Sequence, residues 1–176
     1  MKNRLDALLG FLAVKSKRRL FLLVVLGIAA FIDFFNLGLV RRTFVFYASG
    51  GGEVTVEDRM LKRSPSQELD ITRYVEEALW GPVSPDSLPL FPRETRLRSL
   101  LYRDGVVYTD LSEDAALPPV EGGEVLTNFR TLYEGIRRNF SFVKDVRFFI
   151  AGRAAYVEEF RQMGNARASA SGFGGA

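Results

Sequence analysis

The sequence contains no cysteine and no histidine among its 176 residues. Without cysteine, the chain cannot form a disulfide, a thiolate metal site, a cysteine nucleophile or a lipidated N-terminal cysteine. Without histidine, Ser–His and Cys–His catalysis are excluded, and the commonest general base near neutral pH is missing. A zinc site would have to consist of carboxylates alone, which is unusual. We therefore expect no metal and no cofactor.

The chain after residue 40 has no excess of positive charge, although the pI is about 9.3 and the formal net charge is +3. Residues 1–40 carry six Lys or Arg and two Asp, whereas residues 41–176 carry 18 basic and 19 acidic residues. A nucleic-acid-binding protein needs clustered positive charge to displace counterions from phosphates. We therefore expect no nucleic acid among the partners.

One long apolar run is present at residues 20–40, with the sequence LFLLVVLGIAAFIDFFNLGLV. At 1.5 Å per residue, a helix of this length reaches about 30 Å, the thickness of the hydrocarbon core of a bilayer. A carboxylate near the helix centre costs roughly 2.5–3.5 kcal/mol, which the many large apolar residues can offset. We interpret Asp33 either as a tolerated polar residue or as a contact with a partner helix.

Positive charge precedes the apolar run, and only Arg41 and Arg42 follow it closely. The positive-inside rule therefore predicts a single-pass membrane protein with a cytoplasmic N-terminus. In this interpretation residues 1–19 are a basic cytoplasmic tail, residues 20–40 are a transmembrane anchor, and the rest lies outside the cytoplasm. Two alternatives remain: a signal peptide cleaved near the small residues 27–29, or a buried core helix of a cytosolic protein.

The two ends of the chain have their own patterns. Four leucines at helical spacing within residues 5–12, with basic neighbours, indicate either an amphipathic helix on the inner membrane surface or a simple topology signal. Residues 163–176 are small and polar, and we predict that they are disordered.

Residues 42–162 show the alternating patterns of one compact α+β domain, with the order β-β-α-β-β-α-β. Two amphipathic helices should pack on one side of a mostly antiparallel sheet. The predicted strands are residues 42–47, 53–63, 96–103, 106–111 and 143–150. The first predicted helix starts after Ser64 and ends at residue 80, and the second runs from about Glu124 to residue 139. A short last strand or helical turn is expected at residues 154–160, and the strand at 143–150 should be buried on both faces.

Local signals support these boundaries. Ser64 with Gln67 forms a capping-box pattern, and Gly81-Pro82 should stop the first helix. Asp104-Gly105 between two strands favours a type I′ turn. The predicted apolar face of the first helix consists of Leu69, Thr72, Val75 or Ala78, and Leu79. That of the second helix consists of Leu126, Phe129, Leu132 with Tyr133, Ile136 and Phe140.

Few residues have the character of a catalytic or ligand-binding site. Gly50–Gly52 lack the Lys-Ser/Thr of a phosphate-binding loop, so we interpret them as a hairpin loop. Three pairs of adjacent carboxylates should point apart rather than converge, which makes surface charge their default role: they are Glu76-Glu77, Glu113-Asp114 and Glu158-Glu159. Four aromatic residues are candidates for stacking on a glycan, with burial in the core as the alternative for each: they are Trp80, Tyr102, Tyr108 and Tyr133.

Four short motifs follow one another along the chain: LWGP at 79–82, FPRETRL at 91–97, GVVYTDLS at 105–112 and VRFFIAG at 146–152. In this order they resemble the GerMN domain of bacterial sporulation and spore germination proteins, found also in envelope lipoproteins. The resemblance covers residues 42–158. It implies a compact α/β module of the bacterial envelope, membrane- or lipid-anchored, without established enzymatic activity. The lipobox cysteine of the lipoprotein members is absent here, and the apolar run takes its place.

Taken with the resemblance, the sequence predicts a non-catalytic protein of the bacterial cytoplasmic membrane whose extracytoplasmic domain mediates interaction or assembly at the cell envelope. Its partners would be the membrane, other envelope proteins or a second copy. Binding of peptidoglycan or another glycan is the alternative, and a cell-wall hydrolase is the weakest hypothesis, because it needs two carboxylates at a set separation across a cleft. The sequence assigns no catalytic, cofactor-binding or metal-ligating residue, and the partner-binding residues stay undetermined.

Overall fold

The computed structural model describes residues 15–36, 38–49, 53–119 and 124–162. The chain divides into two units, with the boundary between Leu39 and Val40. Three predictions lie outside the described residues: the leucine pattern at 5–12, the glycine loop at 50–52 and the disordered tail at 163–176. The side chain of Asp33 also lies outside them, so its role stays a prediction.

The first unit contains helix α2, Lys15–Asn36. The predicted apolar span was too long at its C-terminal end, because Leu39 and Val40 belong to strand β1, Leu39–Ala48. Gly38, with φ of +55°, lies between the two elements in a conformation that suits glycine. Among the residues that the structure describes, no helix meets the length and apolarity needed to cross a membrane.

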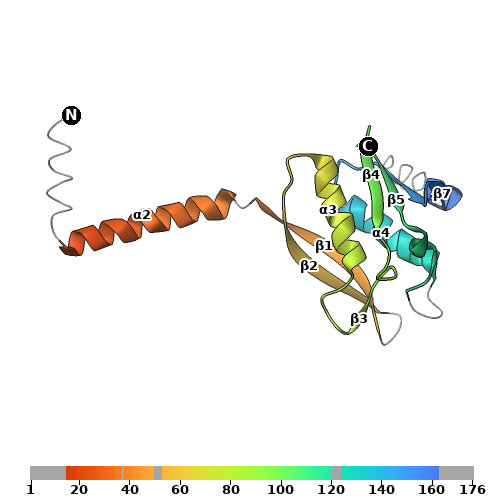
Figure 1. The fold of residues 1–176 in the computed structure, drawn as a ribbon, viewed down its shortest axis with the longest axis horizontal. Coiled ribbons are helices and arrows are strands. Elements are labelled where there is room, and N and C mark those ends of the chain that lie inside the picture. The colour runs from red at the N-terminus through yellow and green to blue at the C-terminus, as the bar shows by residue number, and fades with distance from the viewer. Residues whose placement is uncertain (1–14, 37, 50–52, 120–123, 163–176) are drawn as a thin grey trace, which may run out of the picture. The chain divides into compact units, whose positions relative to one another are not determined.

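The second unit contains the predicted order of elements together with two short additions, strand β3 and the 3₁₀ helix η1, in segments expected to be loops (Figure 1). The elements after β1 are β2 Val54–Lys62, α3 Gln67–Trp80, β3 Ser87–Leu88, β4 Leu97–Arg103, β5 Val106–Leu111, η1 Glu113–Ala116, α4 Val125–Asn139, β6 Asp145–Ile150 and β7 Arg153–Ala155. A helical turn at 157–162 follows β7.

The strands form two sheets, so the prediction of a single sheet was wrong, whereas the strand pairs are mostly antiparallel as predicted. The first sheet has the order β2-β1-β3 and the second β4-β5-β6-β7. β5 pairs antiparallel with β4 but parallel with β6. The parallel pair arises because α4 lies between β5 and β6 in the chain, and a crossover helix returns the chain in the same direction.

Helix α3 begins two residues later than the capping pattern predicted. Ser66, not Ser64, is its N-cap, and the Ser66 side chain accepts a hydrogen bond from the Leu69 N–H (3.1 Å). The N–H of Ser64 instead donates to the Asp70 carboxylate. With Leu69 rather than Gln67 at the third helical position, no capping box forms.

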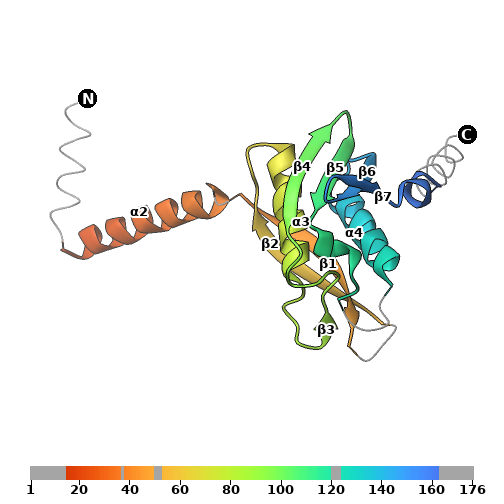
Figure 2. The same cartoon turned by 45° about the vertical axis from the view of Figure 1, so that its right-hand side comes forward.

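The buried face of α3 includes Val75, Ala78 and Leu79 as predicted, but its first half is rotated from the prediction. Leu69 is 52% exposed, whereas Ile71 and Tyr74 are buried together with Val75 and Ala78. Both views place α3 between β2 and β4 (Figures 1 and 2), and α3 also contacts α4. The neighbouring elements therefore determine which face of α3 is buried, and the spacing of apolar residues alone does not reveal it.

Three other expectations concern the second sheet and the helix beside it. Asp104 and Gly105 have φ of +54° and +86°, as the predicted type I′ turn requires. The predicted face of α4 is confirmed, with Phe129 and Ile136 fully buried. Strand β6, expected to be buried on both faces, exposes Arg147, so only one face lies in the core.

Aromatic rings join the two sheets and the two long helices into one core. Tyr74 of α3 stacks on Phe44 of β1, with ring centroids 4.5 Å apart, and meets Phe140 edge-on at 5.7 Å. Phe129 of α4 packs edge-on against Phe91 and Phe148, at 5.0 and 5.1 Å. Such pairs contribute about 0.5–1.5 kcal/mol beyond the burial of their area. The first sheet is therefore fixed to the second through the helices.

The close approach of α3 and α4 requires glycine at position 135. A Cβ atom there would lie 2.4 Å from Tyr74 Oη but 3.5 Å from Tyr74 Cζ. We expect Gly135→Ala to cost about 1–3 kcal/mol in packing, partly offset by about 1 kcal/mol of helix propensity. In a Tyr74→Phe background the clash disappears, so the same substitution should become neutral or stabilising. Urea unfolding of the four variants measures this, and equal destabilisation in both backgrounds would contradict it.

Candidate functional site

The structure separates the four aromatic candidates. Trp80 is 84% exposed, whereas Tyr133 is fully buried in the core. Tyr102 and Tyr108 are half-buried, and Tyr102 packs edge-on against Phe142 (ring centroids 5.4 Å apart). Only Trp80 therefore offers a largely free aromatic face.

Trp80 borders a pocket of about 500 Å³ at the end of α3. The wall opposite the helix comes from the segment that leads into β4. Besides Trp80, the pocket is lined by Glu76, Leu79, Arg93, Thr95, Arg96 and Leu97. Its volume falls within the range of roughly 300–1,000 Å³ that is usual for small-molecule sites.

A larger groove of about 680 Å³ lies between α4 and the strands β1 and β2, but none of the four aromatic candidates lines it. Tyr47, its one aromatic residue, is half-buried and shares a hydrogen bond with Thr131 through its hydroxyl (2.6 Å). This groove therefore lacks a free aromatic face, and we take the Trp80 pocket as the candidate site.

The end of α3 holds Trp80 in place. Gly81 adopts φ of +86° and its N–H donates to the Ala78 carbonyl (3.2 Å), so the helix stops directly after Trp80 as predicted. A Cβ atom at Gly81 would lie 3.2 Å from the Pro89 Cβ, which shows how closely the following loop packs on the helix end. Glycine is therefore needed here both for the turn and for the close approach.

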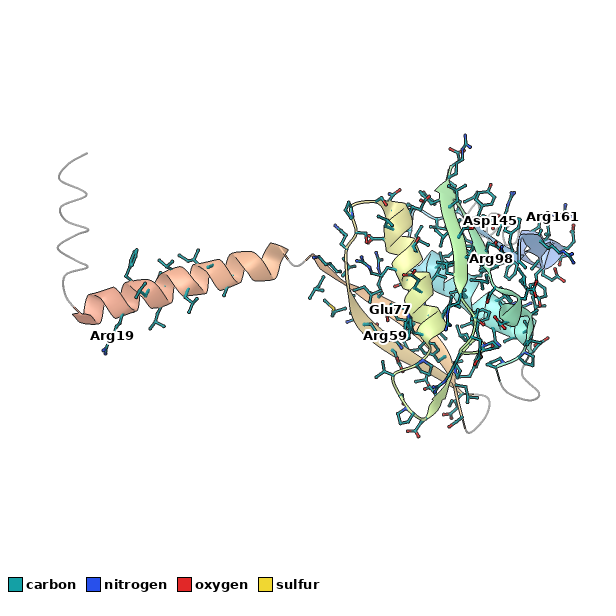
Figure 3. The ribbon with its side chains drawn as sticks, in the orientation of Figure 1. Arg19, Arg59, Glu77, Arg98, Asp145 and Arg161 are labelled. Carbon is teal, nitrogen blue, oxygen red and sulfur yellow. The ribbon has the colours of Figure 1, made fainter. Side chains whose placement is uncertain are left out.

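A half-buried charged network fixes the same helix end and the loop after it. Arg59 of β2 donates to the Gly81 carbonyl (2.7 Å) and to the carboxylates of Glu57 (2.6 Å) and Glu77 (3.4 Å). Figure 3 shows Arg59 and Glu77 next to each other across the gap between β2 and α3. Glu57 in turn accepts the N–H groups of Val83 (3.1 Å) and Ser84 (3.1 Å). Strand β2 thereby holds the end of α3 through Arg59 and the loop after Gly81 through Glu57.

This network should make the fold sensitive to acid. Burial alone would raise the pKa of Glu57, but the hydrogen bonds from Arg59, Ser84 and Val83 outweigh it and lower that pKa below the ordinary value of 4.5. The stability that ionised Glu57 contributes is then fully present above its unfolded-state pKa near 4.5. It is lost as the pH falls through the lower pKa of the folded state. We expect the melting temperature of Glu57→Gln to depend less on pH in this window than that of the unaltered chain, and parallel curves would contradict the assignment.

One member of each carboxylate pair has a partner within the domain. Glu77 binds Arg59, and Asp114 accepts a hydrogen bond from the Ser112 hydroxyl (3.0 Å). Glu158 pairs with Arg161 at 2.5 Å on the surface. Within the described ranges, no group of three or more carboxylates could hold a metal ion.

Residues of the recognised motifs have structural roles. The Ser112 hydroxyl accepts the Arg96 N–H (3.0 Å), and the Asp110 carboxylate accepts the Gly152 N–H (2.9 Å). These bonds connect the ends of neighbouring strands. Arg93, Arg96 and Thr95 were not singled out as binding residues by sequence reasoning, because only the folded loop brings them to Trp80.

Two packed sheets and two long helices define a small mixed α+β domain. The chain belongs to the family described as Germane, sporulation and spore germination, which matches residues 44–155 and contains the GerMN domain. The expectation from the sequence is thereby confirmed.

One solved structure supports this fold. The first GerMN domain of the sporulation protein GerM from Bacillus subtilis is 19% identical, with a TM-score of 0.51 over 66% of this chain and 86% of that one. The tandem GerMN domains of the same protein match at 19% identity and a TM-score of 0.48, over 65% of this chain and 39% of that one. No curated protein matches the sequence.

Proposed function

We propose that the chain is a membrane-anchored, non-catalytic protein whose GerMN domain mediates interaction or assembly at the bacterial cell envelope. Membership in a sporulation and germination family supports an envelope role. The proposed partners are other envelope proteins or a second copy of the chain.

The observation that carries the anchoring part is the apolar surface of α2. Nine large apolar side chains between positions 20 and 31 are exposed, at 38–66%. Contiguous apolar patches of this kind mark membrane or protein contacts. Basic residues precede the apolar run, which favours a cytoplasmic N-terminus. The exposed side chains are Leu20, Phe21, Leu22, Leu23, Val24, Val25, Leu26, Ile28 and Phe31.

The absence of cysteine makes the topology directly testable. A single cysteine introduced as Ser141→Cys should react with a membrane-impermeant maleimide in intact cells, whereas Asn3→Cys should react only after lysis. The full chain should remain in the membrane fraction after a carbonate wash. Recovery in the soluble fraction, or labelling of the Asn3→Cys variant alone in intact cells, would overturn the anchored topology.

The interaction part is tested by crosslinking in living cells. Photoreactive residues placed at exposed positions of the domain should capture a defined envelope protein or a second copy. Leu101 of β4 (52% exposed) and Val157 after β7 (55% exposed) are suitable positions because neither lies in the core. Crosslinks confined to abundant, unrelated proteins at both positions would contradict an assembly role.

Binding of cell-wall glycan is a second candidate, favoured by one specific observation. Trp80 presents an 84% exposed indole at the edge of a pocket, and an exposed indole can stack on the C–H face of a sugar ring. Sedimentation with purified peptidoglycan sacculi tests this function. Failure of the full chain to sediment with them would exclude it.

A further inference from the structure

The Trp80 pocket combines an aromatic face with polar and cationic walls, which distinguishes it from an apolar protein-docking patch. Its apolar wall is small, because Leu79 is only 9% exposed and Leu97 is half-buried. The remaining lining is Glu76, Thr95 and two arginines. An indole surrounded by hydrogen-bonding groups suits a ligand with both an apolar face and many polar substituents, such as a saccharide.

The two arginines provide directed positive charge. One Arg96 guanidinium nitrogen donates to the carbonyls of Arg93 (2.6 Å) and Thr95 (3.0 Å), which orients the group at the pocket wall. Guanidinium groups have five donors in a planar fork that matches a carboxylate. The Arg93 guanidinium makes no ion pair or hydrogen bond within the described part of the chain. Both side chains are exposed and can therefore take an anionic group of a ligand.

A buried hydroxyl in the pocket wall is the third element. Thr95 is 2% exposed, and its Oγ1 has no hydrogen-bond partner among the described residues. Buried hydroxyls without a partner are uncommon, because desolvation is then uncompensated. A sugar hydroxyl in the pocket would supply the missing partner after a small adjustment of the wall.

We infer that the pocket binds a saccharide that carries a carboxylate, with Trp80 stacked on the sugar ring and Arg93 and Arg96 on the carboxylate. This inference rests on the second proposed function, glycan binding, and adds its chemical specificity. Glu76 at the rim disfavours a ligand with several negative charges, so a single carboxylate fits better than a phosphate polymer.

Trp80 is the only tryptophan in the chain, so its fluorescence reports directly on the pocket. The full chain, purified in detergent, is titrated with the disaccharide of N-acetylglucosamine and N-acetylmuramic acid, and separately with chitobiose, which lacks the carboxylate. The acidic disaccharide should shift the emission to shorter wavelength and protect the indole from acrylamide quenching. Chitobiose should bind at least about tenfold more weakly.

Arginine variants separate the carboxylate contact from stacking. Arg93→Gln should reduce affinity for the acidic disaccharide about tenfold and leave chitobiose binding unchanged. Arg153→Gln is the matched control, because Arg153 is also exposed but lies on β7, outside the pocket. Equal affinities for the two sugars, or no effect of Arg93→Gln, would overturn the inference.

Sedimentation with sacculi distinguishes failure of this inference from failure of glycan binding itself. If Trp80→Ala abolishes sedimentation but Arg93→Gln does not, the chain binds glycan without recognising a carboxylate. The inference then fails, while the proposal of glycan binding stands. If the unaltered chain does not sediment, both fail. If Trp80→Ala leaves sedimentation intact but removes a crosslink to an envelope protein, the pocket is a protein-docking site and the inference is overturned.

Discussion

Replacement of Arg59 by alanine is expected to destabilise the domain by roughly 2–4 kcal/mol, because it breaks a charged network from which water is largely excluded. The Arg59 and Glu57 side chains are only 13% and 14% exposed. Removal of the guanidinium leaves the Glu57 carboxylate with only its two main-chain donors and the Gly81 carbonyl without its partner. It also removes cation–π contacts with Phe44 (4.8 Å) and Phe46 (5.5 Å). Denaturant unfolding of the purified chain measures the loss.

Arg98→Ala is the matched control for this prediction. Arg98 forms an ion pair with Asp110 at 3.7 Å, but its side chain is 50% exposed, so its removal should change stability by less than about 1 kcal/mol. Arg59→Ala should also lower the fluorescence anisotropy of Trp80, since the end of α3 loses its attachment to β2. A cost no larger than that of Arg98→Ala would show that the network contributes little.

The second large effect is expected at Asn139, whose side chain completes the edge of β1. Its Oδ1 accepts the Thr43 N–H (2.9 Å) and its Nδ2 donates to the Thr43 carbonyl (2.7 Å), as a neighbouring strand would. Asn139→Ala leaves the Thr43 N–H without a partner, while the carbonyl keeps the Tyr74 hydroxyl (3.2 Å). We expect a loss of about 2–3 kcal/mol.

Two measurements test this role of Asn139 specifically. Amide hydrogen exchange at Thr43 should accelerate in Asn139→Ala more than exchange at buried Phe46 of the same strand. Asn139→Asp keeps an acceptor for the Thr43 N–H but turns a carboxylate oxygen toward the carbonyls of Thr43 and Gly135, so it should destabilise the chain at least as much as Asn139→Ala. An Asp variant as stable as the unaltered chain would show that the carbonyl contact is dispensable.

Local sequence signals predicted the elements well, because each depends on a few adjacent residues. Gly81 and the Asp104-Gly105 pair both have the positive φ that their turns require, so the predicted helix end and the predicted turn are confirmed. The prediction of Ser64 as the N-cap was wrong, because Asp70, a residue inside the helix, binds the Ser64 main chain and Ser66 caps the helix instead. That contact has no signature in a local capping pattern.

The arrangement of the strands and the composition of the site could not be predicted in the same way. The parallel pairing of β5 with β6 and the split into two sheets depend on contacts between distant residues. For the site, the sequence proposed Trp80 among four aromatics, but exposure alone distinguished it from Tyr133, which lies in the core. Arg93 and Thr95 join the pocket through the fold of the loop that follows Gly81, which no spacing rule describes.

The contact between Asn139 and β1 has a consequence for the time course of folding. The two partners are 96 residues apart in the chain. At about 5–20 residues per second, the first strand therefore leaves the ribosome roughly 5–20 s before the side chain that completes it. During this interval α3 joins β1 early, but α4 is still missing from the core. The first sheet therefore completes its hydrogen bonds only after residue 139 has been synthesised.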